Sequence, residues 1–247
     1  MNTQTRKELL TLFRGWEILF YMIGWFIVNY LFFYVASKNP LVSVCVGIVG
    51  ALFFFFVFSY KNLRLKTYQF QLNELLKYVT NMSFYLKTGE NVLHALENVK
   101  ETLHTSIQKD VEKSIQGMRN DAVLQTGHFG KYDFPTLNQF HQNLVIKYEH
   151  GGDPGELFSR IQKNMITELK KRDELYRKRK AFAFSVYMLL GMVMSIELML
   201  RFVVPELWDM FLSFEFASMA VLLMAHLFAF LNLFFLQKKT VDISVRY

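Results

Sequence analysis

The chain has 247 residues, of which 52% are hydrophobic, 17% aromatic and only 20% charged, with a net charge of +7. This composition excludes an ordinary soluble domain, and the single cysteine, Cys45, excludes a disulfide framework or a metal site built from cysteine pairs. Residues 61–180 hold 20 of the 28 Lys and Arg and 14 of the 21 Asp and Glu, so the middle of the chain is typical of a soluble domain and both ends are typical of membrane segments.

Four apolar runs of about 20 residues interrupt the chain, and each has the length that a helix needs to cross the hydrocarbon of a bilayer. A backbone in lipid must satisfy its own hydrogen bonds, so each run is expected to be helical. The runs are Ile18–Ala36, Leu41–Tyr60, Ala181–Val204 and Phe216–Leu236. The sequence therefore predicts an all-α membrane protein with two transmembrane hairpins, in residues 1–60 and 181–247, around a central cytoplasmic helical-bundle domain, residues 61–180.

Charge asymmetry predicts the orientation of these spans. The connection between the first two runs has four residues, 37–40, and the connection between the last two, 205–215, carries three acidic residues and no basic one. Lys and Arg flank the opposite ends of all four runs. By the positive-inside rule, both termini and residues 61–180 are expected in the cytoplasm, with the protein a multi-pass component of the cell membrane.

The middle of the chain shows helical periodicity and no alternation long enough to predict a strand. Gly89 is expected to end the first helix and Asn91 to cap the second. Residues 127–134 are expected to form a loop. The predicted helices are Lys66–Lys87, one that follows Asn91, Ser106–Arg119, Thr136–Tyr148 and one that begins at Glu156.

A glycine-rich turn precedes the last of these helices. Gly151 and Gly152 are expected to stop the preceding helix, Asp153 to cap the next, and Leu157 to begin its apolar face. A phosphate-binding loop is the alternative, but the Gly-Lys-Ser/Thr ending of such loops is absent from the sequence. No Pro or Gly interrupts residues 156–180, so this helix can continue into the third span.

Catalytic chemistry is not predicted. The six histidines are scattered without metal-ligand spacing, no catalytic triad can be chosen by spacing, and no Asp lies inside a predicted span. We therefore expect no enzyme activity, no cofactor and no metal, and any energy input must come from a partner.

Charged residues near the third span are the candidate contacts with partners. Glu197 and Arg201 are spaced four residues apart, which suits either a local ion pair or a polar contact with another protein. The basic cluster before the span suits anchoring at anionic lipid headgroups or docking to an acidic partner; interspersed acidic residues argue against nucleic acid. The candidate contact residues are Lys170, Lys171, Arg172, Arg177, Glu197 and Arg201.

The motifs of the middle domain resemble a known family. Leu86, Gly89, Ala95 and Leu96 reproduce a Leu-x-x-Gly-x-x-x-x-x-Ala-Leu signature, and Gly151-Gly152 followed by Leu157 reproduces a second one. Both are similar to the F-domain family of type II secretion, in particular to the single-domain inner-membrane platform proteins of Tad-type pilus machines. The helices here are rich in Lys and Phe where that family commonly has Ala.

The resemblance implies a non-enzymatic platform protein. Such proteins form oligomers with themselves or with a similar platform protein, and they connect a cytoplasmic hexameric secretion ATPase to the assembly of pilin-like subunits. Two other classes stay open on the residues alone: a membrane subunit of a small transporter, and a membrane-anchored scaffold or signalling protein. The spans carry few polar groups and no Gly/Pro-broken helices of the kind that line transport sites.

Overall fold

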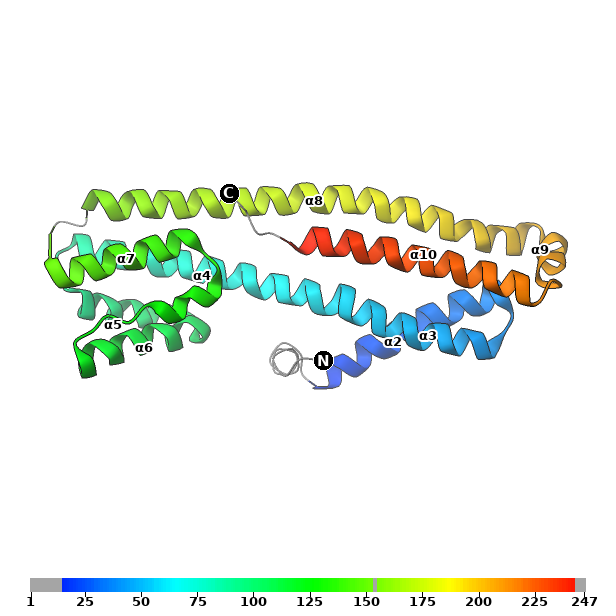
Figure 1. Cartoon of the computed structure of the whole chain (residues 1–247), viewed down its shortest axis with the longest axis horizontal. Coiled ribbons are helices and arrows are strands. Elements are labelled where there is room, and N and C mark those ends of the chain that lie inside the picture. The colour runs from blue at the N-terminus through cyan, green and yellow to red at the C-terminus, as the bar shows by residue number, and fades with distance from the viewer. Residues whose placement is uncertain (1–14, 153–154, 243–247) are drawn as a thin grey trace. The chain divides into compact units, whose positions relative to one another are not determined.

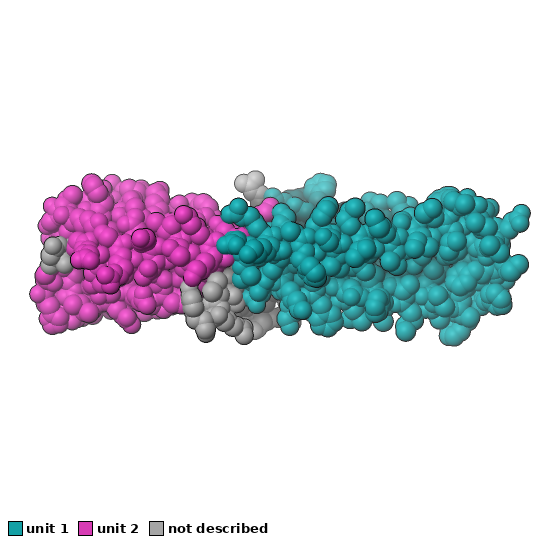
Figure 2. Space-filling view, turned by 90° about the horizontal axis from the view of Figure 1, so that it is seen from above, with its two compact units in different colours: residues 1–65, 174–247 teal, residues 66–173 magenta. Residues whose placement is uncertain are grey.

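The computed structural model describes residues 15–152 and 155–242, and every regular element in these ranges is a helix (Figure 1). The chain divides into two compact units, coloured in Figure 2. Unit 1 comprises residues 1–65 and 174–247, and unit 2 comprises residues 66–173. The predicted all-α class is therefore confirmed, and the units are described separately below.

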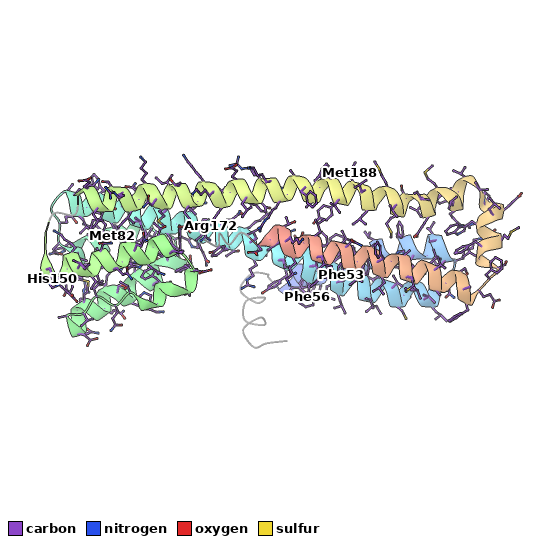
Figure 3. The ribbon with its side chains drawn as sticks, turned by 45° about the horizontal axis from the view of Figure 1, so that its top comes forward. Phe53, Phe56, Met82, His150, Arg172 and Met188 are labelled. Carbon is purple, nitrogen blue, oxygen red and sulfur yellow. The ribbon has the colours of Figure 1, made fainter. Side chains whose placement is uncertain are left out.

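Four helices in the described residues are long and apolar enough to cross a membrane, as predicted. The first is α2 (Gly15–Ser37); the second combines α3 (Pro40–Phe54), η1 (Phe55–Tyr60) and α4 (Lys61–Lys87). The third is α8 (Gly155–Val203) and the fourth is α10 (Phe216–Val241). The apolar part of α8 is almost entirely exposed, as Met188 illustrates in Figure 3, so lipid or another protein must cover it.

Helices α2 and α3 form a tight hairpin. Asn39 caps α3, because its Oδ1 accepts hydrogen bonds from the backbone nitrogens of Leu41 and Val42 at 3.1 and 3.3 Å. Glycine permits the close approach of the two helices: a Cβ atom on Gly50 would lie 2.5 Å from Cγ of Asn29. The polar Asn29 is thus covered, and its Nδ2 donates to the carbonyl of Trp25 at 2.7 Å.

The second span does not end where the apolar run ends. A π-helical segment, η1, joins α3 to α4, giving one uninterrupted helix of 48 residues from Pro40 to Lys87. The expected separate helix from Lys66 is the continuation of this span, because no Pro or Gly occurs between residues 51 and 88. Trp25 of α2 packs against this region by stacking on Phe54, and its Nε1 donates to Oγ of Ser59 at 3.2 Å.

The connection before α10 contains a short helix, α9 (Pro205–Leu212). Trp208 of α9 is buried, and its Nε1 donates to the carbonyl of Ala36 at 2.8 Å. This hydrogen bond joins the connection between α8 and α10 to the end of α2.

Unit 2 is a helical bundle with one continuous apolar core. It contains the greater part of α4, then α5 (Val92–Thr102), α6 (Thr105–Asp121), the 3₁₀ helix η2 (Gly127–Tyr132), α7 (Pro135–His150) and the first part of α8. The predicted loop at 127–134 thus contains a short helix. The core includes Leu75, Met82, Leu96, Ile107, Leu137, Phe140 and Phe158.

Local signals placed the turns of unit 2 correctly. Gly89 has a φ of 91° just after α4, and Oδ1 of Asn91 accepts a hydrogen bond from the backbone nitrogen of His94 at 2.8 Å. Gly151 and Gly152, with φ values of 75° and 96°, follow α7. The expected cap Asp153 lies outside the described residues.

Candidate functional site

Helices α4 and α8 run antiparallel within unit 2. Nε2 of Gln162 donates to Oγ1 of Thr80 at 3.1 Å, and Nη1 of Arg172 donates to the hydroxyl of Tyr68 at 3.0 Å. The later residues of α4 therefore lie beside the earlier residues of the bundled part of α8. Within unit 2, the end of α4 lies level with the start of α8, as Figure 1 shows.

Exposed apolar side chains occur at this level, among them Ile146, which is 53% exposed near the end of α7 (Pro135–His150). Phe84 of α4 is 62% exposed and Leu157 of α8 is 47% exposed, while the next residue, Phe158, is buried in the core. The glycine turns 89 and 151–152 lie at the same end, because they directly follow α4 and precede α8. We call Phe84, Leu157 and these three glycines the turn end of unit 2.

The signature residues divide between core and surface. Ala95 and Leu96 are fully buried, so they hold α5 in the bundle. Gly89, Gly151 and Gly152 supply backbone conformations with positive φ, and no other group lies within 4 Å of a Cβ added at any of them. Their role is therefore conformational, and Leu157 is the one signature side chain available to a partner.

The basic residues of α8 do not all face outward. Lys170, Lys171 and Arg177 are exposed, but Arg172 is only 4% exposed (Figure 3). Nη2 of Arg172 donates to Oε1 of Glu168 at 2.8 Å and to the carbonyl of Asp133 at 3.3 Å. Arg172 is therefore a buried structural residue, and unlike Lys170, Lys171 and Arg177 it offers no contact to a partner.

A threonine of α7 also contacts the Arg172–Glu168 ion pair. Oγ1 of Thr136 donates to Oε2 of Glu168 at 2.5 Å, so α7 is joined to α8 through the same carboxylate. Burial alone would lower the pKa of Arg172, but Glu168 and Tyr68 raise it, and the guanidinium stays charged. The cluster fixes α4, α7 and α8 together at the end of unit 2 where the chain enters and leaves.

The excess positive charge lies outside the bundle. Residues 66–173 hold 14 Lys and Arg against 13 Asp and Glu, so unit 2 is almost neutral. Four cations at residues 177–180 and two at Lys61 and Arg64 stand on the same helices nearer to the apolar spans. Their position favours the interpretation as an anchor at lipid headgroups.

Of the two alternatives left open for Glu197 and Arg201, the local ion pair is not formed, because Arg201 pairs with Asp209 instead. Nη1 of Arg201 contacts Oδ1 of Asp209 at 3.0 Å, and Nζ of Lys38 contacts the same oxygen at 2.8 Å. Helix α9 turns the chain back and presents Asp209 to both cations, which spacing along one helix could not reveal. Oε2 of Glu197 is buried without a hydrogen-bond partner in the described residues.

Sequence patterns missed two buried polar groups in unit 2. Asp110 accepts a hydrogen bond from the hydroxyl of Tyr132 at 2.6 Å and pairs with Lys131 at 2.6 Å, which ties η2 to α6. Burial would raise the pKa of Asp110, but these two partners outweigh it and lower the pKa. His141 lies 3.3 Å from the hydroxyl of Tyr78, and burial lowers its pKa to about 3.

Neither group forms a site for a ligand. Within residues 15–152 and 155–242, no three His, Cys, Asp or Glu side chains are grouped so that they could hold a metal ion. Asp110 is satisfied by Tyr132 and Lys131, whereas Nδ1 of His141 is buried without a hydrogen-bond partner in the part of the chain that the structure describes.

Comparisons with protein-family models, curated proteins and solved structures gave no match for this chain. The class that the structure defines is an all-helical protein with four candidate membrane spans and a separate helical unit, inserted between the second and third spans.

Proposed function

We propose that the chain is a non-enzymatic inner-membrane platform protein of a type II secretion or Tad-type pilus assembly machine. In this function it couples a cytoplasmic hexameric secretion ATPase to the assembly or export of pilin-like subunits. It acts as an oligomer with itself or with a similar platform protein. The proposal places unit 2 and both termini in the cytoplasm, on the charge asymmetry of the sequence.

The continuity of α8 carries this proposal. Phe158, Ile161 and Met165 bury the start of α8 in the core of unit 2, and the same helix continues without interruption to Val203 through an apolar span. The second span continues into α4 in the same way. We expect a rotation or tilt imposed on unit 2 to be transmitted along α8, because its backbone hydrogen bonds run without interruption from Gly155 to Val203.

The turn end of unit 2 is the surface that we assign to the ATPase. It presents Phe84 and Leu157, and exposed apolar side chains are suited to contacts with other proteins. Unit 2 is almost neutral, so apolar contact rather than charge attraction is expected to dominate this docking.

A pair of matched variants of the full chain tests the assignment. Phe84→Ser removes a ring from the turn end, while Phe70→Ser removes a ring that is 46% exposed near the other end of the same helix. We expect Phe84→Ser to weaken co-purification with the cognate ATPase about tenfold, the loss of about 1.4 kcal/mol, and Phe70→Ser to leave it unchanged. Equal binding by both variants and the parent chain would exclude the turn end as the docking surface.

A further inference from the structure

A cavity of about 600 Å³ lies in unit 1, where the turns of both hairpins meet. Leu212, Phe216 and Met219 form apolar walls, and Lys38, Asn39 and Glu215 are polar residues that also line it. The cavity is open to the surroundings, since Leu41 and Phe216 of its lining are 80% and 87% exposed, so it suits a group that enters from the lipid surface. Nothing in the proposed platform function uses it.

The ends of three spans surround the cavity. Helix α2 ends at Ser37, α3 begins at Pro40 and α10 begins at Phe216, and residues 37, 40 and 216 line the cavity. The apolar run of the first span ends at Ala36, that of the second begins at Leu41 and that of the fourth begins at Phe216. The cavity therefore lies where the hydrocarbon ends and the lipid headgroups begin.

Charge at the cavity has two signs. Lys38 lines the cavity and pairs with Asp209, which Arg201 also contacts. These three side chains carry one net positive charge, and Glu215 on the lining balances it. The amino-terminal ends of α3 and α10 add partial positive charge. Glu215, in contrast, precedes α10 without capping it through its side chain, and so supplies a carboxylate at the cavity.

We propose that this cavity binds the headgroup of a phospholipid that carries a primary ammonium, such as phosphatidylethanolamine. The phosphate lies against Lys38 and the two helix ends, and the ammonium donates hydrogen bonds to Glu215. The first carbons of the lipid tails contact the apolar walls. A choline headgroup lacks the N–H donors that Glu215 requires, and a glycerol headgroup lacks the cation.

Native mass spectrometry of the full chain in mild detergent tests this proposal. The protein is titrated with phosphatidylethanolamine, phosphatidylcholine and phosphatidylglycerol of identical tails. We expect phosphatidylethanolamine to bind at least about fivefold more tightly than the other two, since each ammonium–carboxylate hydrogen bond contributes about 1 kcal/mol or more.

Four variants separate the two charges from general effects. Lys38→Gln lowers the affinity for all three lipids, and Glu215→Gln removes the preference for phosphatidylethanolamine over phosphatidylcholine. The controls Lys109→Gln, on the exposed face of α6 in unit 2, and Glu206→Gln, at the start of α9, leave both quantities unchanged. Helix content by circular dichroism identifies any variant that fails to fold.

Two results would overturn the proposal. One is equal affinity of the parent chain for the three lipids, or no lipid retained at all. The other is a preference that persists in Glu215→Gln, which would place the ammonium elsewhere. Because the readout is lipid binding, failure here leaves the platform function untouched, and loss of ATPase binding leaves this site untouched.

Discussion

His141 makes the stability of unit 2 depend on pH. Its ring is buried against Phe129 and Tyr78, and the folded state keeps it neutral down to about pH 3. An unfolded histidine takes up a proton below about pH 6.5. The unfolded state therefore binds more protons between these two values, and the stability falls as the pH falls through that window.

Replacing His141 should remove the dependence of the stability of unit 2 on pH. In the parent chain we expect the free energy of unfolding of unit 2 to decrease by up to about 1.4 kcal/mol per pH unit below pH 6.5. His141→Phe should flatten this slope, whereas His150→Gln, at the exposed end of α7, should retain it. Pulse proteolysis of the full chain in urea at several pH values measures the slope. A steep slope in His141→Phe would assign the proton uptake to another group.

Substitution of a glycine at the turn end is expected to destabilise unit 2. Gly152 has a φ of 96° with open space around it, so a side chain there costs backbone strain alone. We expect Gly152→Ala to destabilise unit 2 by about 1 kcal/mol, and Gly152→Val by more. Gly130→Ala is the matched control, since Gly130 is also open but has no positive φ. If both alanine variants were equally stable, the turn would not depend on the conformation of Gly152.

Residue-scale features were predictable where they are local. The positive φ at Gly89 and the cap by Asn91 follow from a few neighbouring residues, and the structure confirmed both. The burial of Arg172 was not predictable, because its neighbours Tyr68 and Asp133 come from distant parts of the chain. The pairing of Arg172 with Glu168, four residues earlier on α8, is local, but its burial depends on these distant neighbours.

At the scale of elements, the length of α8 has the clearest functional consequence. Its 49 residues include the apolar span and the part packed in unit 2. The absence of Pro and Gly from residues 156–180 was sufficient to predict this continuity. Helix α9 and the π-helical segment η1 were not predictable, because tertiary contacts of Trp208 and Trp25 accompany them.

Breaking α8 should separate binding from assembly. We expect a flexible Gly-rich insertion between Leu175 and Lys180 to leave ATPase binding intact, since unit 2 is unaltered, and to abolish pilus assembly or secretion. An insertion of about seven alanines, roughly two helical turns, keeps the helix and its register and should retain most activity. Co-purification and an assembly assay measure the two properties. Full activity with the Gly-rich insertion would show that α8 does not transmit motion.

At the scale of the whole molecule, composition and hydropathy were enough to predict four spans and a helical middle segment. The predicted domain, residues 61–180, and the observed unit 2, residues 66–173, differ at both ends. The difference includes most of the excess positive charge. The boundaries of unit 2 depend on tertiary packing and lie within α4 and α8. The predicted boundaries depend on composition, which changes at the edges of the apolar runs.

The location of unit 2 is the central claim, because a secretion ATPase can reach it only from the cytoplasm. Single cysteines introduced into a Cys45→Ala background report the side of the membrane through a membrane-impermeant thiol reagent. Asn120 of α6 and Leu207 of α9 are both exposed. We predict that Leu207→Cys is labelled in intact cells and that Asn120→Cys is labelled only after the membrane is opened. Labelling of Asn120→Cys in intact cells would contradict the cytoplasmic location and with it the platform function.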